Sequence, residues 1–424
     1  MAESIASRAL QVFPGGISNG EFGWPPESLV AIQRGHGARV WDTAGREYLD
    51  FSMGWGSALV GHARAEIVEA VQRQAALGSN FAHLNEPCLL LAEEIRRVSR
   101  AAKQIRFCTS GTEATMYCQR LARAATGRPK ILKFEGAYHG ANEAGVTSLF
   151  PTRQLPFPQP EHTSAGTPSV DRELLVAPYN DLGMTELIVS QHGHELAAVL
   201  MEPLQRCTPP EPGFLAGVRR ICDEAQVLLI FDEVVTGFRL AYGGAQEYYG
   251  VVPDLVAYGK ALGGGYPIGA FGGRPELMDH VNEQHIGSPG YVWMASTLGG
   301  NPVSSAAGNA ALAVLRTPGT YAALHALGER FRASLREVLK RCGVTAQVIG
   351  DGPLAQIVFT SVAVNDYRTS ARGDKQMARK MMLGLFERGI FLNPMGTKFY
   401  LSIAHDESIC DMFCNRLEDV LNQR

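Results

Sequence analysis

Cysteine pairs, long apolar runs and an excess of charge of one sign are all missing from this 424-residue sequence. The eight cysteines are scattered, without a CxxC pair or the histidine and cysteine spacing of a zinc site, which predicts reduced thiols, no metal and a cytoplasmic location. No uninterrupted apolar stretch reaches the roughly 18 residues of a membrane-spanning helix, and the amino terminus lacks the apolar core of a signal peptide. With a formal net charge of -3 and no basic patch, we expect neither a nucleic-acid nor a membrane partner.

Glycine and proline are plentiful, with 46 and 23 residues spread along the chain. This composition predicts many tight connections, as in an α/β enzyme. Beyond about residue 315, charged amphipathic helices alternate with short strands, which is typical of a smaller α+β domain joined to a larger one. We therefore expect an N-terminal segment over 1–52 that packs with the small domain, a large domain over 53–300 and a C-terminal small domain over 301–424.

One acid and one lysine each follow an apolar run. The run 227–231 (VLLIF) stops at Asp232, and the run within 254–260 (DLVAYGK) stops at Lys260. Because ligands bind beyond the carboxyl ends of parallel strands, we expect both side chains to face one crevice. Glycines at 263–265 leave room for a bulky ligand. A lysine nucleophile beside a carboxylate suggests pyridoxal 5'-phosphate, and the alternative is a structural ion pair.

A second candidate site is a turn between a strand and a helix. The run 105–108 (IRFC) is predicted to be a strand, and the apolar spacing over 114–125 predicts a helix. Ser110, Gly111 and Thr112 lie between them, so backbone NH groups and two hydroxyls would meet at the helix amino terminus. This arrangement favours phosphate binding. The alternative is simple N-capping without a ligand.

Further candidates follow other predicted strands. Tyr138 and His139 would flank a flat ring, or would form a packed core pair. Glu202 ends the run LAAVLME, where it would face the site or make a supporting hydrogen bond. Thr297 precedes a Gly-Gly-Asn turn, either as a helix cap or as a phosphate-binding hydroxyl. The proline-rich segment 149–169 is long and irregular, which is typical of a lid or gate.

The order of these motifs resembles that of the class III aminotransferases, and is most similar to glutamate-1-semialdehyde aminomutase-like members of that family. The shared motifs are SGT at 110–112, YHG at 138–140, DEV at 232–234, GKALGGG at 259–265 and STLGGNP at 296–302. The resemblance covers nearly the whole chain. It implies the type I fold of enzymes that depend on pyridoxal phosphate, with a mainly parallel sheet of the seven-stranded type in the large domain and a smaller α+β C-terminal domain.

Carried over residue by residue, the resemblance implies pyridoxal phosphate as the cofactor. Lys260 would form the internal aldimine and move the substrate proton, while Asp232 would pair with the pyridinium nitrogen. Val234 and Tyr138 would pack on the two faces of the ring. Thr297 would reach the phosphate of a neighbouring subunit, which implies a homodimer. The implied cofactor-binding set is Ser110, Gly111, Thr112, Tyr138, His139, Glu202, Asp232, Val234, Lys260 and Thr297.

The substrate side departs from the aminomutase pattern. Where the aminomutase has a carboxylate-binding arginine after the PGG motif, this chain has SNGEFGWPP, with Glu21 and Phe22 at that place. Together with Trp55, Phe22 suggests an apolar or aromatic pocket. We therefore expect an aminotransferase that moves an amino group from an amine or a β- or ω-amino acid to an oxo acid, through an external aldimine and pyridoxamine phosphate. The alternatives are intramolecular transfer of the aminomutase type and a cofactor-binding protein without turnover.

Overall fold

The computed structural model describes residues 4–20, 23–167, 172–392 and 397–423. The contacts between residues divide the chain into two compact units. The small unit contains Met1–Arg64, Ala322–Val364 and Ser370–Arg424, and the large unit contains Ala65–Tyr321 and Asn365–Thr369. The functional domain boundaries expected at 52 and 300 stay a prediction.

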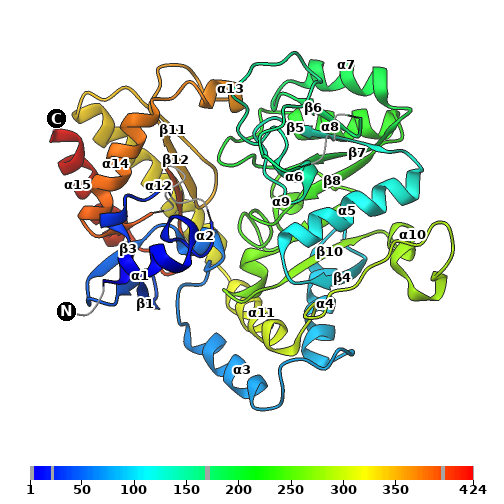
Figure 1. Ribbon diagram of the computed structural model, residues 1–424, viewed down its shortest axis with the longest axis horizontal. Coiled ribbons are helices and arrows are strands. Elements are labelled where there is room, and N and C mark those ends of the chain that lie inside the picture. The colour runs from blue at the N-terminus through cyan, green and yellow to red at the C-terminus, as the bar shows by residue number, and fades with distance from the viewer. Residues whose placement is uncertain (1–3, 21–22, 168–171, 393–396, 424) are drawn as a thin grey trace. The chain divides into compact units, whose positions relative to one another are not determined.

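The large unit is built around a seven-stranded sheet whose strand order is β4-β10-β9-β8-β7-β5-β6 (Figure 1). Strand β10 is antiparallel to both of its neighbours, and the other pairs are parallel. The strands are β4 (Gln104–Cys108), β5 (Lys130–Phe134), β6 (Leu174–Ala177), β7 (Leu196–Met201), β8 (Leu228–Asp232), β9 (Leu255–Tyr258) and β10 (Gly269–Gly273). The predicted mainly parallel sheet of seven strands is confirmed.

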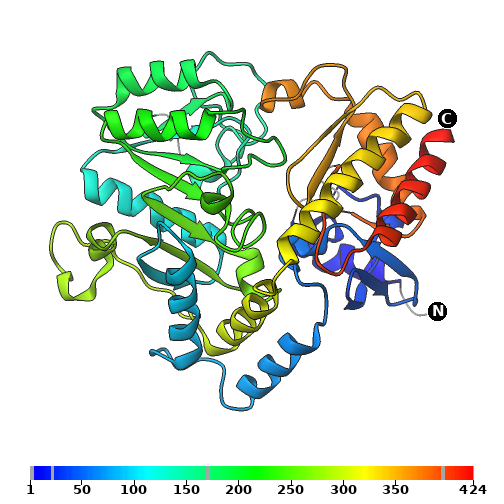
Figure 2. The same cartoon turned by 180° about the vertical axis from the view of Figure 1, so that it is seen from behind.

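Helices cover both faces of this sheet. Helix α5 lies across one face, and α7 and α8 lie side by side on the other (Figures 1 and 2). A sheet buried on both faces needs strands that are apolar throughout, and every residue of β7 is buried. The helices of this unit are α3 (Ala65–Ala75), α4 (Glu86–Val98), α5 (Gly111–Thr126), α6 (Glu143–Val146), α7 (Leu182–His192), α8 (Phe214–Glu224), α9 (Ala245–Tyr248), α10 (Pro275–Met278) and α11 (Pro302–Leu315).

The register of β8 against β9 places the acid and the lysine at one edge. Asp232 is the last residue of β8 and lies opposite Ala257 on β9. Lys260 comes just after the end of β9, at the start of a short 3-10 helix over Lys260–Gly263. Since the two strands are parallel, both residues lie at the carboxyl edge of the sheet, as the sequence predicts.

The small unit has two sheets. One has the order β1-β2-β3-β13 and the other the order β11-β12-β14. Its strands are β1 (Ile32–His36), β2 (Arg39–Asp42), β3 (Glu47–Asp50), β11 (Gln347–Ile349), β12 (Leu354–Val358), β13 (Ile390–Phe391) and β14 (Lys398–Tyr400). Its helices are α1 (Ile5–Val12), α2 (Met53–Gly56), α12 (Thr320–Arg341, of which Thr320 and Tyr321 belong to the large unit), α14 (Lys375–Glu387) and α15 (Glu407–Asn422), while α13 (Tyr367–Ser370) straddles the division. Strands β2 and β3 pair antiparallel as a hairpin.

The small unit has an aromatic core. Phe51 stacks on Phe331 with their ring centroids 5.5 Å apart, and Phe413 lies 5.2 Å from Phe331. Trp24 packs on Phe386 at 4.5 Å, so this tryptophan takes part in packing. In the part of the chain that the structure describes, none of the helices has the length and apolarity needed to cross a bilayer.

Candidate active site

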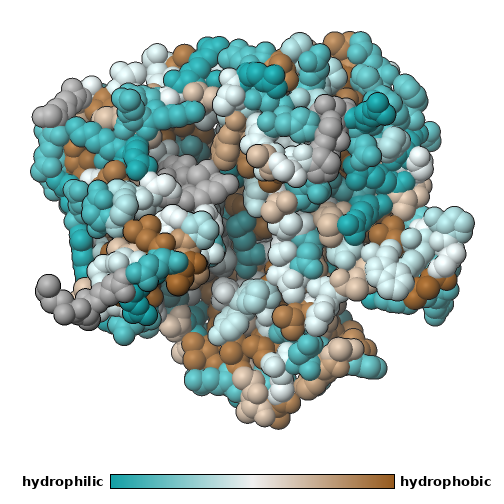
Figure 3. All heavy atoms as spheres, in the orientation of Figure 1, coloured by the Kyte–Doolittle hydropathy of each residue, from teal (hydrophilic) through white to brown (hydrophobic). Residues whose placement is uncertain are grey.

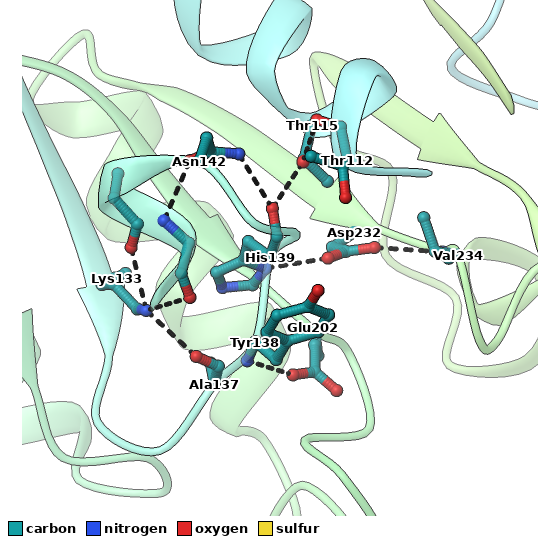
Figure 4. Close-up of polar contacts among 12 residues, drawn as sticks. Thr112, Thr115, Lys133, Ala137, Tyr138, His139, Asn142, Glu202, Asp232 and Val234 are labelled. Carbon is teal, nitrogen blue, oxygen red and sulfur yellow. Dashed lines mark hydrogen bonds and ion pairs between the residues drawn. The ribbon is translucent and has the colours of Figure 1, made fainter. Parts of the chain in front are cut away.

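The centre of the sheet edge is a buried pair of Asp232 and His139. Their Oδ2 and Nδ1 atoms are 2.8 Å apart, and Oδ1 of Asp232 accepts a hydrogen bond of 3.1 Å from the backbone NH of Val234 (Figure 4). Because an ionised carboxylate only accepts, Nδ1 of His139 carries the proton. Nε2 of this fully buried ring has no hydrogen-bond partner among the described residues. The histidine therefore orients the carboxylate.

Two glycines make a narrow floor around Val234. A Cβ atom added at Gly111 would lie 2.7 Å from Cγ2 of Val234, and one added at Gly259 would lie 3.3 Å from Cγ1 of the same residue. The Cβ position at Gly259 is also 3.6 Å from the backbone of Gly111. The amino terminus of α5 and the end of β9 therefore meet at Val234, where backbone and a flat ligand can approach closely.

Lys260 is held beside this floor in an unusual backbone conformation. Its φ is +44°, in the left-handed region that L residues rarely adopt, and the residue is half-buried. A residue other than glycine in this region costs on the order of 1 kcal/mol or more, and such strain concentrates at functional sites. The strained turn fixes where the side chain leaves the backbone.

The amino terminus of α5 combines capping with unused NH groups. Oγ of Ser110 accepts a hydrogen bond of 3.2 Å from the NH of Glu113, so this serine is the N-cap. The carboxylate of Glu113 accepts from the NH of Thr109 at 2.8 Å and from the hydroxyl of Ser110 at 3.1 Å. Burial raises the pKa of Glu113, but hydrogen bonds from the hydroxyl and NH of Thr109, from Ser110 and from Ser296 together hold it below its usual value. The NH groups of Gly111 and Thr112 have no intrahelical partner and remain for an anion.

Glu202 links two segments at the same edge. It follows β7, is buried, and accepts hydrogen bonds of 3.0 Å from the backbone NH groups of Tyr138 (Figure 4) and Arg206. The ring of Tyr138 is exposed to 37%, so its face is accessible. These contacts are supporting hydrogen bonds of the kind given as the alternative for Glu202, and its place in the cofactor-binding set stays a prediction.

Glu233 lies beside Asp232 in the chain but serves another network. It is fully buried, and its carboxylate accepts hydrogen bonds from the NH groups of Ala245 and Gln246 and from the side chains of Gln246 and Thr236. Burial raises the pKa of Glu233. The first acid of the DEV motif thus lies in the site, and the second one braces the start of α9.

Lys133 is a site-supporting residue that sequence reasoning missed. It is fully buried on β5, and its Nζ donates to the carbonyl group of Ala137 (Figure 4) and to those of Ala144, Gly145 and Thr147, at 2.8–3.2 Å. Burial lowers the pKa of the ammonium group to about 7. Since the ammonium has three N–H donors and the neutral amine has two, these carbonyl groups favour the charged form. Lys133 thereby ties down the loop that carries Tyr138 and His139.

Substitution of Lys133 tests this support. In Lys133→Met the four carbonyl groups lose their buried donor, so we expect the free energy of unfolding to fall by about 3 kcal/mol. Urea denaturation measures it. Lys130→Met is the matched control on the same strand, because Lys130 makes a partly exposed ion pair with Glu195 and should cost under about 1 kcal/mol. A loss in Lys133→Met that is no larger than in the control would contradict the supporting role.

The segment after the YHG loop is irregular over 149–167, as expected. Its buried Glu161 accepts hydrogen bonds from the NH groups of Thr152 and Arg153 at 3.2 and 2.9 Å. The NH of Glu161 donates to the hydroxyl of Ser148 at 2.8 Å. The carboxylate of Glu161 therefore connects the two ends of this stretch of the segment. Its role as a lid stays a prediction.

Three further predicted site residues are Thr297, Trp55 and Phe22. Thr297 is exposed in a turn of the large unit. Trp55 belongs to the small unit, in a turn over Met53–Gly56 whose four residues all have positive φ, +47°, +57°, +58° and +82°. Phe22 lies outside the described residues. The described residues contain no group of three or more His, Cys, Asp or Glu side chains that would hold a metal ion.

The Aminotransferase class-III family model matches residues 24–421, and the chain belongs to this family. Glutamate-1-semialdehyde 2,1-aminomutase from Aquifex aeolicus is 36% identical over 437 residues, which cover 99% of each chain. An omega-transaminase from Sphaerobacter thermophilus has a TM-score of 0.91 at 37% identity, covering 98% of this chain and 96% of that one. A glutamate-1-semialdehyde-aminomutase variant from Pseudomonas aeruginosa, solved with PMP, has a TM-score of 0.87 at 25% identity, covering 98% and 93%.

The chain is thus an enzyme that depends on pyridoxal phosphate. The residues at the sheet edge fit this group: NH groups at a helix terminus suit its phosphate, the floor at Val234 suits a flat ring, and a buried carboxylate suits a ring nitrogen that carries a proton. When bound, the cofactor supplies a ring that accepts electrons from the substrate carbon.

Proposed function

We propose that this enzyme transfers an amino group from an amine or amino acid donor to an oxo-acid acceptor, with Lys260 as the catalytic residue. The observation that carries the proposal is the meeting of Asp232, Lys260 and the amino terminus of α5 at one edge of the sheet. Phe22 and Trp55 stay substrate candidates from the sequence alone, where they favour a β- or ω-amino group on an aromatic or apolar donor.

The contacts of each residue suggest its role toward the cofactor. Asp232, oriented by His139, would keep the ring nitrogen protonated, since a buried carboxylate favours a positive partner. Val234 and Tyr138 would border the two faces of the ring. The amine of Lys260 would bind the cofactor covalently and would move a proton at the substrate carbon.

The phosphate of the cofactor would be held at the start of α5. Its oxygens would accept hydrogen bonds from the NH groups of Gly111 and Thr112, with the hydroxyl groups of Ser110 and Thr112 nearby. Oγ1 of Thr112 also accepts a weak hydrogen bond of 3.3 Å from the NH of Ala141, which connects this turn to the loop of Tyr138 and His139. Glu202 would act through the backbone of Tyr138.

Intramolecular transfer is the second candidate. The sequence relative from Aquifex aeolicus is named an aminomutase, and this name favours intramolecular transfer. The structural neighbour named an omega-transaminase favours transfer between two substrates. Residues 9–33, which include the segment after the PGG motif, contain neither arginine nor lysine. The arginine that the aminomutase pattern has in this segment is therefore missing, so we give transfer between two substrates as the main proposal.

The need for an acceptor separates these candidates. We expect an amine donor alone to give one turnover per active site, because the amino group stays on the cofactor, and continuous turnover to begin when an oxo acid is added. Product is quantified by chromatography over time with a panel of β-amino acids, aryl amines and ω-amino acids. Glutamate-1-semialdehyde is also tested alone, as a substrate for intramolecular transfer. Its continuous conversion without an acceptor would show aminomutase activity and overturn the main proposal.

We also propose a homodimer and a cytoplasmic location. Large apolar side chains are exposed around α3, α4 and the turn before α11 (Figure 3), which is typical of an interface. The side chains concerned are Leu77, Phe81, Leu84, Leu89, Leu90 and Leu298. The exposed Thr297 lies next to Leu298, so a second copy on this surface would bring Thr297 to the partner's phosphate. All eight cysteines are free, which supports a reducing compartment.

A further inference from the structure

Arg206 lies at the same sheet edge and has no role in the site described so far. It follows β7 by a few residues and is half-buried. The central carbon of its guanidinium group lies 5.9 Å from the ring centroid of Tyr138 and 5.9 Å from that of Phe150. In the described chain, the guanidinium forms no ion pair and no hydrogen bond with another residue. It is a cation near two aromatic rings that has no carboxylate within ion-pair distance in the part of the chain that the structure describes.

The backbone holds Arg206 in this position. Its φ is +59°, a conformation that glycine adopts freely and arginine does not. Its NH is bound to Glu202 at 3.0 Å, and the other oxygen of that carboxylate binds the NH of Tyr138 at the same distance. One buried carboxylate thus holds the backbone at both residues. The Arg206 and Tyr138 side chains therefore extend from backbone positions that are fixed relative to each other.

A guanidinium group in this setting recognises a carboxylate. It is always charged and presents donors in a planar fork that matches two carboxylate oxygens. The rings of Tyr138 and Phe150 exclude part of the water around it, which strengthens binding of an anion. Among the described residues, the guanidinium group forms no ion pair with Glu202, whose two oxygens accept the backbone NH groups of Tyr138 and Arg206.

We propose that Arg206 binds the carboxylate of the substrate, so that the substrates are amino acids and oxo acids and not simple amines. The inference rests on the proposed function, since it places the carboxylate next to the ring of Tyr138, which borders the cofactor. It supplies the cation that residues 9–33 lack. The cofactor phosphate has its own site at the start of α5, which leaves Arg206 to the substrate.

The test compares matched pairs of donors that differ only in the carboxylate. The pairs are 3-amino-3-phenylpropanoate with 1-phenylethylamine, and 5-aminopentanoate with butan-1-amine. For Arg206→Gln holoenzyme, we expect kcat/KM to fall by roughly 10- to 100-fold for the amino acid and to change less than about twofold for the amine. Arg206→Lys should retain part of the preference. Arg120→Gln is the control, because Arg120 lies 5.6 Å above the ring of Tyr117, away from the site.

Binding of 3-phenylpropanoate, which does not react, gives a readout separate from turnover. Calorimetry should show that Arg206→Gln holoenzyme binds 3-phenylpropanoate more weakly than the wild type does, by a factor similar to the fall in kcat/KM. The affinity for 3-phenylpropan-1-ol, which has no carboxylate, should be the same in both proteins. An unchanged preference for the carboxylate in the variant, or an equal loss for both members of a pair, would overturn the inference. So would loss of cofactor binding, which would make Arg206 a phosphate anchor. A wild-type enzyme that converts no donor contradicts the proposed function, and 3-phenylpropanoate binding then decides the inference alone.

Discussion

Lys260→Ala is expected to abolish amino transfer, with kcat reduced by at least about 10⁴-fold, because the variant has neither the amine that bonds to the cofactor nor the base that moves the substrate proton. The variant should fold, since alanine accommodates the turn at +44° no worse than lysine does. It should still bind pyridoxal phosphate through the contacts at α5 and Asp232, but without the yellow colour of the covalent form. Stopped-flow absorbance after mixing with an amine donor measures the loss.

The control is Lys103→Ala, which removes an exposed lysine of the same unit. Its turnover should match that of the wild type. Added small amines such as methylamine should restore part of the activity of Lys260→Ala, since they replace the missing base. Turnover at the wild-type rate in Lys260→Ala would refute the assigned role.

Asp232→Asn is expected to reduce kcat by about 10³-fold while cofactor affinity falls much less. Asparagine has no charge with which to keep the ring nitrogen protonated. Its amide also places a donor or a neutral oxygen opposite Nδ1 of His139, so the buried hydrogen bond of 2.8 Å is weakened or the histidine tautomer changes. The phosphate contacts at α5 are untouched. Single-turnover kinetics and a cofactor titration measure the two effects separately.

Asp223→Asn is the matched control, because Asp223 is an exposed partner of Arg219 on α8. It should leave both quantities unchanged within about twofold. A deuterium label on the substrate carbon adds a sharper criterion: in Asp232→Asn, proton removal should become the slow step and the isotope effect on kcat should rise. An unchanged rate in Asp232→Asn would show that this carboxylate does not govern the ring.

The sequence was sufficient to predict the parts of the fold in which local pattern and tertiary structure agree. The stop of VLLIF at Asp232 gives the end of β8, and the apolar spacing after Ser110 gives α5, closed by Gly127 in a left-handed conformation. In each case the burial of an apolar run and a local capping signal fall at the same residues.

Strand β10 shows where such reasoning fails. Its sequence GAFGG has low strand propensity, yet all five residues are buried between β4 and β9. Neighbouring backbone explains the glycines, since a Cβ at Gly269 would lie 2.2 Å from the carbonyl oxygen of Ser110 and one at Gly272 would lie 2.6 Å from that of Gln104. The glycines of β10 are needed because neighbouring backbone approaches this strand closely. A single sequence does not show such contacts.

Some residues of the candidate site could be predicted from the sequence, and others could not. The positions of Asp232, Lys260 and Ser110 follow from strand ends and a helix start, which the sequence marks. Lys133 and Arg206 escaped prediction because their partners are loop carbonyls and rings from other segments. A charged residue inside the apolar run KILKF was the available signal for Lys133.

The most direct measurement of the central claim is the identity of the lysine that carries the cofactor. The holoenzyme is reduced with borohydride, digested and analysed by mass spectrometry. We expect a phosphopyridoxyl group on Lys260, in the peptide that contains GKALGGG, and no label there without reduction. A label on another lysine, or no label in protein that has bound pyridoxal phosphate, would contradict it.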